Sequence, residues 1–394
     1  MHHLFSPFIA TALTAALLVV ADQGDDCSVH KAVAGEYVTG AVPMNDNPLA
    51  HFDTPMVTTF NSSASEVWAF DAGSHDGKAG IVVYLSRGTV ASNLAAQRAL
   101  ISVSWPNGSR YMENAFYQQS VVTSCAHETV GTWSDGADGD QASSMWRFTA
   151  SRDLRRAKVF INSPTIQGTF ELENRGPPLY PGGLIYPNPN ASVLLAPEMY
   201  WQEHFPVASA SANLSIKGTP FMLSGVGGRD KNWNSRPWAV VSGNWDMARA
   251  VAGPYGLMLW NYTSGVDGRP YFSATLMEEG NVVFRTAVDG GGGSSPGAYH
   301  GTSGTVSLAY DGPHHLTSPS SGTPPPSRHT GYVVDLVSQH RHWRFNIDFS
   351  QTVFWFPADK ALTVGQYVGN VTGGLVGGRR YNGVASGSLQ EFVL

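Results

Sequence analysis

The stretch from Ser224 to Tyr262 contains the residues whose types and spacing could do chemistry. It begins with a predicted glycine turn and continues as GGRDKNW, in which Asp230 and Lys231 are adjacent. The stretch also carries the glycines Gly225, Gly227 and Gly228 and the tryptophans Trp233, Trp238, Trp245 and Trp260. Large flat apolar surfaces with a few convergent polar groups are typical of small-molecule pockets. The alternative is that the indoles belong to the core and that Asp230 and Lys231 form a turn.

The sequence lacks the motifs of several common chemistries. The glycines of this stretch do not open a helix after a buried strand, which argues against a dinucleotide site. The pairs His314–His315 and His340–His342 lack a third ligand at a familiar spacing, so no metal site is expected. No G-x-S-x-G nucleophile elbow occurs. A glycosidase needs two facing carboxylates and stays possible. The available carboxylates are Glu66, Glu113, Glu203, Asp230 and Asp246.

Composition favours strands over helices as the elements that position these residues. Charged residues make up 14% of the chain, against about 25% in average usage, and there are 43 glycines. Short apolar or alternating runs between turn residues predict an antiparallel sandwich or barrel. The only helix expected in the first half is at 90–100. Strands are expected at 66–70, 81–85, 99–105, 116–123, 145–150, 157–161, 166–172, 212–216, 237–245, 257–262, 271–278, 282–286, 304–310, 332–337, 340–349, 353–356 and 383–393.

Alternation along two of these strands assigns their faces. A glycan on Asn261 would face outward and turn Met258, Trp260 and Tyr262 toward the interior. Between His340 and Phe349 one face is polar and the other is apolar. Either of these two faces could line a cavity, and the sequence leaves both open.

The chain is long enough for two domains. Its 394 residues exceed the size at which single cores stop growing. A loop-rich region at 175–189 precedes a segment, 198–205, that is aromatic and polar together, which is typical of a segment beside a cavity. We therefore predict a β-sandwich or lipocalin-like domain at 22–207 and a lipocalin-like β-barrel at 208–394, with the pocket at their junction.

Several features predict a protein routed through the secretory pathway. Residues 1–21 have the pattern of a signal peptide and are too short to span a bilayer. The only two cysteines, Cys27 and Cys125, are expected to form a disulfide, with two buried free thiols as the alternative. Glycosylation sequons are present at Asn61, Asn107, Asn190, Asn213, Asn261 and Asn370. A net charge of -6 without a basic cluster argues against nucleic acid.

The order of short motifs resembles the superfamily of two-domain lipocalin-like proteins that includes bacterial carotenoid hydratases and fungal Diels–Alderases. The matching pieces are EVWAFD at 66–71, Tyr200–Trp201 before a strand, GVGGRDKNW at 225–233 and GVASGSLQE at 383–391. The DKNW element is the most specific of them. The signal peptide, cysteine pair and sequons are similar to the secreted branch, the hetero-Diels–Alderases of tropolone–sesquiterpenoid pathways.

This resemblance implies a cofactor-free pericyclase that acts on small apolar natural products. An enzyme of that branch is expected to dehydrate a hydroxymethyl precursor to an o-quinone methide. It then directs this diene onto the alkene of a humulene-type macrocycle, which gives a dihydropyran. Holding the two partners face to face supplies most of such a rate enhancement.

The chemistry of such a reaction suggests roles for individual residues. Expected hydrogen-bond donors are Lys231, His204, Arg344 and Tyr200, and Asp230 and Glu203 are expected either to act as acid–base groups or to orient those donors. The expected walls of the pocket are Trp68, Tyr200, Trp201, Trp233, Trp245, Trp260, Trp343 and Trp355. Two alternatives remain open: a hydratase or dehydratase acting on a terpenoid, and a secreted lipocalin-like carrier that binds a hydrophobic ligand without converting it.

Overall fold

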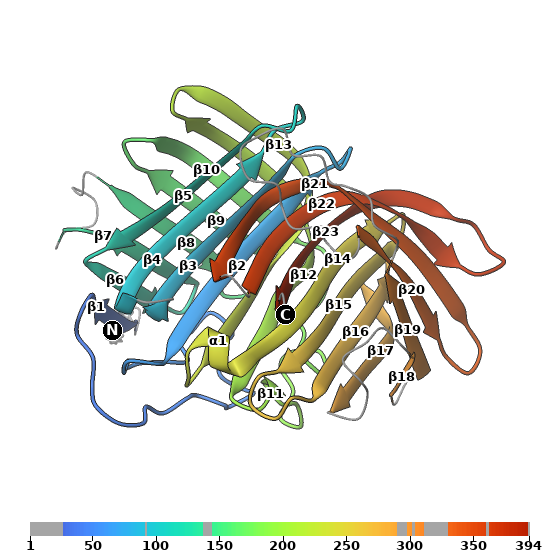
Figure 1. The fold of residues 1–394 in the computed structure, drawn as a ribbon, viewed down its shortest axis with the longest axis horizontal. Coiled ribbons are helices and arrows are strands. Elements are labelled where there is room, and N and C mark those ends of the chain that lie inside the picture. Colours follow the sequence, from blue (N-terminus) through green and yellow to red (C-terminus); the bar gives the residue numbers. More distant parts are fainter. Residues whose placement is uncertain are drawn as a thin grey trace, which may run out of the picture.

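The computed structural model describes residues 27–90, 93–136, 144–289, 298–301, 304–310, 330–359 and 362–392. Within these ranges the chain forms twenty-three strands and one four-residue helix, arranged in two antiparallel sheets (Figure 1). The all-β prediction is confirmed. The predicted helix at 90–100 is wrong, because Asn93–Ser104 is strand β4, which pairs with strands on both sides. Its residues Ala99, Ile101 and Val103 alternate into the core with the period of a strand.

The first sheet curves into a half-barrel around one hydrophobic core. Its strand order is β1-β6-β7-β8-β9-β10-β12-β13-β2-β3-β4-β5, and β11 pairs with β12. Its other strands are β1 (Ser28–Val33), β2 (Ser65–Ser74), β3 (Gly80–Val90), β5 (Arg110–Tyr117), β6 (Gln119–Ser124), β7 (Glu128–Ser134), β8 (Met145–Ser151), β9 (Arg156–Asn162), β10 (Ile166–Asn174), β11 (Leu194–Ala196), β12 (Met199–Ile216) and β13 (Thr219–Asn234).

The second sheet forms a nearly closed barrel, since its edge strands β17 and β18 lie next to each other. Its order is β17-β16-β15-β14-β23-β22-β21-β20-β19-β18. The strands are β14 (Ser242–Ala252), β15 (Tyr255–Ser264), β16 (Pro270–Glu278), β17 (Asn281–Asp289), β18 (Ala298–Gly301), β19 (Gly304–Tyr310), β20 (Gly331–Val337), β21 (His342–Asp359), β22 (Leu362–Leu375) and β23 (Tyr381–Phe392).

The chain passes from one sheet to the other after Asn234, not near residue 207. The expected boundary falls inside β12, an 18-residue strand that pairs along its length with β13. The aromatic and polar segment at 198–205 is the first half of this strand rather than a connector. The linker is 235–241, and it contains the helix α1 (Trp238–Val241) in a region where a strand was expected at 237–245.

Each sheet has a face that points away from its own hydrophobic core, and the two sheets pack against each other through these faces. Strands β2–β5, β12 and β13 of the first sheet contact β14, β15 and β21–β23 of the second (Figure 1). An apolar cluster at this junction joins Val82 of β3 to Val353 and Phe354 of β21. The polar face of the strand around Trp343 is exposed, and its apolar face packs in the barrel core, which settles the orientation that the sequence left open.

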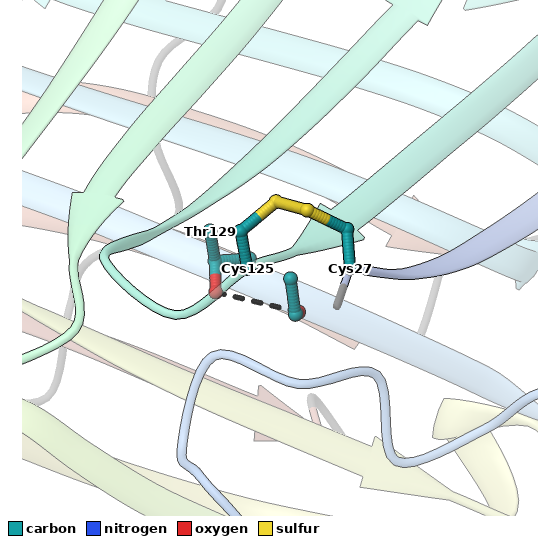
Figure 2. Close-up of a disulfide and its surroundings, with 4 residues drawn as sticks. Cys27, Cys125 and Thr129 are labelled. Carbon is teal, nitrogen blue, oxygen red and sulfur yellow. Dashed lines mark hydrogen bonds between the residues drawn. A yellow bond between two sulfur atoms is a disulfide. The ribbon is translucent and has the colours of Figure 1, made fainter. Parts of the chain in front are cut away.

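Cys27 and Cys125 form the predicted disulfide (Figure 2). The bond ties the segment before β1 to the turn between β6 and β7. Beside it, the Thr129 hydroxyl donates a hydrogen bond to the Ser124 hydroxyl over 3.3 Å. The predicted signal peptide at 1–21 lies outside the described residues. Within the described part, no helix is long and apolar enough to cross a membrane.

The six sequons do not share one environment. The asparagine of one of them, Asn261, is buried, and its amide donates to Asp246 over 3.2 Å. A glycan cannot occupy this position in the folded chain, so that part of the prediction is corrected. Met258, Trp260 and Tyr262 nevertheless lie on the opposite face of β15, at the junction. The asparagines of four sequons are exposed: Asn107, Asn190, Asn213 and Asn370; Asn61 is half-buried.

Candidate active site at the junction of the two sheets

Asp230 and Lys231 are neighbours on β13 and therefore face opposite sides of the first sheet. Asp230 faces the junction, where Arg249 of β14 approaches it. Lys231 faces the half-barrel core, where its ammonium lies over the rings of Trp68 and Trp233. The predicted glycine turn before them is wrong, because this whole stretch is extended and paired with β2 and β12.

Arg249 is the centre of an ionic cluster at the junction. Its guanidinium contacts the Asp71 carboxylate of β2, and its Nη2 lies 2.6 Å from Glu203 Oε1 of β12 and 3.8 Å from Asp230 Oδ2 of β13. Its Nε donates to the Pro206 carbonyl over 3.0 Å. One cation of the second sheet thus joins three carboxyl groups on three strands of the first.

Two side chains from other strands complete this cluster. The Ser386 hydroxyl of β23 donates to the second oxygen of Asp71. The Tyr84 hydroxyl of β3 lies 3.5 Å from Gln366 Oε1 of β22. Burial raises the pKa of the Tyr84 phenol, and the Asp230 and Asp71 carboxylates raise it further. Tyr84 is therefore a neutral O–H group at neutral pH.

The Arg249 guanidinium fits because residue 228 is a glycine. A β-carbon at Gly228 would stand 2.2 Å from Arg249 Nε and 2.4 Å from the Phe205 carbonyl oxygen. Both distances are well inside van der Waals contact, so any side chain at this position would displace the guanidinium. This close approach explains the second glycine of the GGRD motif, which the sequence had indicated to be part of a turn.

The surplus of carboxyls over cations keeps protons in this cluster. Burial raises the pKa of the Asp230 carboxyl to about 7, with Arg249 opposing the rise and Asp71 adding to it. Burial also raises the pKa of Glu203 well above its usual range, against the pull of Arg249. Its Oε2 is buried without a hydrogen-bond partner among the described residues. An acid that is half protonated at neutral pH is suited to proton transfer.

An apolar, indole-rich cluster continues the same two faces beyond the ionic cluster. Trp201, two residues before Glu203, packs against Trp260 across the junction with ring centroids 5.5 Å apart. The Nε1 of Trp260 is buried without a partner among the described residues. Trp238 of the linker packs edge-on against Trp245 at 5.1 Å. The remaining members are Leu195, Ala196, Met199, Met247, Met258 and Tyr262.

Lys231 and His204 have a structural environment inside the half-barrel. The segment 52–56 inserts there, and Lys231 Nζ donates to the carbonyls of Phe52 (2.8 Å) and Thr54 (2.6 Å). Lys231 Nζ also lies 3.3 Å from Glu66 Oε1. The same carboxylate accepts a hydrogen bond from the Met56 backbone amide.

Two pKa shifts in this interior group follow from burial. Burial lowers the pKa of Lys231 to about 8, although Glu66 and Asp53 oppose the change. Burial lowers the pKa of His204 to about 4, against the effect of Asp53, 3.4 Å away. Arg229, the next cation on β13, pairs with the same Asp53. These groups anchor the inserted segment and lie on the side of the sheet opposite Asp230.

The expected wall residues do not line one common surface. Trp201, Trp245 and Trp260 lie at the junction. Trp68 and Trp233 belong to the half-barrel core, with Tyr200 stacked on Trp233 at 5.4 Å, and Trp343 belongs to the barrel core. Trp355 is half-buried on β21. Arg344 projects from an exposed face of β21 and pairs with Asp335 at 2.8 Å, apart from the junction cluster.

Arg249, Asp71 and Tyr84 belong to the site but were not among the predicted site residues. Asp71 closes the EVWAFD motif that carried the resemblance, so a signal for it was present. Arg249 and Tyr84 carried none, because their positions depend on how the two sheets pack. Among the described residues, no group of three His, Cys, Asp or Glu side chains could hold a metal ion.

Two of the surface cavities that described residues line lie away from Asp230 and Lys231. One, of about 970 Å³, lies on the first sheet across β7–β10, β12 and β13, and Lys158 and Glu171 form an ion pair in it. The other, of about 210 Å³, opens at the edge of the junction between Val207 of β12 and Met277 of β16.

Comparison with known proteins agrees with this architecture. The sequence profile of the Diels-Alderase-like family matches residues 24–392. The Diels-Alderase poxQ of Penicillium oxalicum is 30% identical over 361 residues, which is 90% of this chain and 76% of poxQ. The Diels-Alderase ffsF of Aspergillus flavipes is 32% identical over 340 residues, covering 85% and 78% of the two chains.

A solved structure shares the fold. The crystal structure of CghA with Sch210972 superposes with a TM-score of 0.73 over 93% of this chain and 98% of CghA, at 20% sequence identity. The family profile spans nearly all of the described chain, including the motifs at 66–71, 225–233 and 383–391. The chain thus belongs to the Diels-Alderase-like family, and this membership supports a pericyclase role.

Proposed function

We propose that the protein is a cofactor-free pericyclase that joins a diene and an alkene by [4+2] cycloaddition at the junction of its two sheets. The observation that carries this proposal is Asp230. It is a buried carboxyl with a pKa of about 7, on the same face as the indole cluster. The indoles would hold apolar reactants, and the acid would act on their one polar group.

Steering is the main requirement of the reaction. A cycloaddition moves no proton, and orienting two reactants can remove roughly 7–11 kcal/mol of barrier. Flat indole faces such as Trp201 and Trp260 suit the faces of a conjugated diene. A hydrogen bond from protonated Asp230 to a carbonyl oxygen conjugated with the reacting atoms would lower the energy of its acceptor orbital. One such preorganised donor contributes about 3–4 kcal/mol.

The specific form that we propose is a hetero-Diels–Alder reaction preceded by dehydration. Protonated Asp230 gives its proton to the leaving hydroxyl of a tropolone-type hydroxymethyl precursor, and the C–O bond breaks to release water. The ring hydroxyl loses its proton, which restores Asp230, and an o-quinone methide results. Its C=C–C=O unit then adds to a humulene-type alkene, forming one C–C and one C–O bond of a dihydropyran.

Substrate entry requires the indole cluster to open, because its rings are in contact. Trp238 is the partly exposed indole of the cluster, held by a 3.0 Å hydrogen bond from its Nε1 to Gln390 and by its contact with Trp245. It lies on the linker, whose helix has no side-chain cap. We expect reactants to enter on this side.

The test uses the full chain purified from a eukaryotic secretory host, because we also propose that residues 1–21 direct secretion. One assay supplies a hydroxymethyl tropolone precursor with humulene, and a second supplies a single polyene that carries both a diene and an electron-poor alkene. Chiral chromatography measures the enantiomeric excess of the adduct, with heat-inactivated protein as the background.

Enantiomerically enriched dihydropyran in the first assay supports the hetero-Diels–Alder form. Enrichment only in the second assay retains the pericyclase and rejects that form. Racemic product at the background rate in both assays contradicts the proposal. Incorporation of oxygen from labelled water into the product would indicate a hydratase instead.

A further inference from the structure

The Arg249 site is built into both sheets. Its guanidinium occupies the space that a side chain at Gly228 would fill. It donates to the Pro206 carbonyl and contacts carboxyls on three strands. Arg249 itself is almost fully buried, so these contacts exchange little with water. Removing one member of a buried ion pair destabilises the fold because the partner is left uncompensated.

The carboxyls around Asp230 depend on Arg249 for a nearby positive charge. The groups that surround Asp230 at the junction are Asp71, Glu203 and Tyr84 of its own sheet and Arg249 of the other, and Arg229 lies on the opposite side of β13. Arg98 of β4 acts on Tyr84. The side chains from β22 and β23, Gln366 and Ser386, are uncharged. Three carboxyls therefore share one guanidinium, and its position sets which of them can be ionised together.

From this geometry we infer that Arg249 is a positioning residue that fixes the orientation and protonation of Asp230. It does so in competition with Asp71, whose second oxygen is held by Ser386. Arg249 itself is saturated by its four partners and does not need to touch the reactants. The inference rests on the proposed function, since it gives Asp230 the role of the acid.

Two variants separate this role from simple stabilisation because they act in opposite directions. Removing the cation in Arg249→Gln should shift the titration of Asp230 upward by about one pH unit or more, as expected for the loss of an opposite charge at this distance. Removing the competing charge in Asp71→Asn should shift it downward. Arg249→Lys keeps the charge without the forked geometry and should titrate closer to the parent protein.

The experiment measures this titration in two ways. Infrared difference spectroscopy of the carboxyl C=O band against Asp230→Asn follows Asp230 directly. The pH dependence of kcat and KM follows it through the reaction. Arg155→Gln, which removes an exposed charge in the turn between β8 and β9, is the matched control. Thermal unfolding of each variant identifies any that fail to fold. If Arg249→Gln does not fold, Asp71→Asn still tests the inference, because it keeps the Arg249 guanidinium.

Opposite shifts of the infrared titration in Arg249→Gln and Asp71→Asn support the inference. Unchanged titration in both variants, or shifts in the same direction, overturn it and leave Arg249 a structural link only. If the infrared titration shifts as expected but no variant or parent protein forms adduct, the proposed function fails while the positioning role stands.

Discussion

Asp230 and Lys231 are consecutive in the chain, but they belong to different polar groups on opposite sides of one sheet. The Asp230 carboxyl lies 3.8 Å from Arg249 at the junction, and the Lys231 ammonium lies 3.3 Å from Glu66 inside the half-barrel. The DKNW motif therefore combines Asp230, to which we assign a catalytic role, with Lys231, whose contacts are structural. Substitutions at the two positions should have different consequences.

Replacing Asp230 by Asn should abolish acid catalysis with little loss of stability. We expect a 10²–10⁴-fold lower kcat, typical of a lost general acid. The parent activity should fall as the pH rises through about 7, because the acid must be protonated, and this limb should disappear in the variant. Since burial disfavours the charged carboxylate, Asp230→Asn should be at least as stable as the parent at pH 8 by urea unfolding.

The control for this variant is Glu173→Gln, an exposed carboxylate on β10. It should change neither the rate nor the pH limb. A parent pH profile without a limb near neutrality, or an Asp230→Asn variant with full activity, would contradict the acid role.

Replacing Lys231 by Met should destabilise the fold and leave the chemistry of folded molecules intact. The change removes the hydrogen bonds that Lys231 Nζ donates to the carbonyls of Phe52 and Thr54. It also leaves the buried Glu66 carboxylate without its Lys231 partner. We expect a loss of about 3–5 kcal/mol in the free energy of unfolding, measured with urea. The double variant with Glu66→Gln should recover part of it. A stable Lys231→Met protein that gives racemic product would instead support a donor role for Lys231.

His204 should make the protein less stable in mild acid. Its folded pKa is about 4, below the ordinary 6.5, so between these values the unfolded chain binds a proton that the folded chain does not. Stability is thus lost as the pH falls from 6.5 to 4, by up to about 3 kcal/mol. His204→Gln should flatten this part of the curve of unfolding free energy against pH.

Asp53 acts in the same direction at lower pH. Its folded pKa lies well below the ordinary value because Arg229 and His204 overcome its burial. The stability it contributes is present above pH 3.8 and is lost as the pH falls further.

For the His204 prediction, the decisive range is pH 6.5 to 4. If the unfolding free energy of His204→Gln changes with pH there as steeply as that of the parent protein, the assignment to His204 is wrong.

Trp260→Phe and Trp343→Phe form a matched pair that separates the junction from the core. Both indoles are buried, and both have an Nε1 without a partner among the described residues. Trp343→Phe should cost about 2 kcal/mol by the loss of packing and keep enantioselectivity. Trp260→Phe should lower enantioselectivity and raise KM. Equal effects of the two variants on product and stability would speak against a substrate wall at the junction.

Replacing both Cys27 and Cys125 by Ser should lower the unfolding temperature. The disulfide closes a loop with a sequence separation of 98 residues, for which chain entropy predicts a contribution of about 4–5 kcal/mol. A reducing agent should have a similar effect on the parent protein and none on the double variant. Equal melting temperatures of the oxidised parent protein and the double variant would show that the disulfide contributes little to the stability of the fold.

The sequence predicted most of the secondary structure because period-2 alternation is a local signal. The runs at 81–85 and 257–262 lie within strands β3 and β15 as expected. The boundary near residue 207 failed because it was placed just past the loop-rich region at 175–189, with 198–205 taken as a bridging segment. That segment is in fact the first half of β12, whose pairing with β13 is not local.

The site was less predictable for the same reason. Asp230 and Glu203 were expected as acid–base groups, and the structure brings them together, directly opposite each other on β13 and β12. Lys231 and His204 were expected beside them but face the other way, since one residue along a strand reverses the side chain. Arg249 comes from the other sheet, and no spacing in the sequence relates it to Asp71.

The junction has one further consequence for how this protein could change over time. The acid comes from one sheet and the facing indoles Trp245 and Trp260 from the other, so the outline of the space between them depends on the tilt of one sheet against its neighbour. Substitutions in the distant contact of Val82 with Val353 and Phe354 could alter that tilt. New product shapes could then arise while every side chain that touches the reactants stays the same.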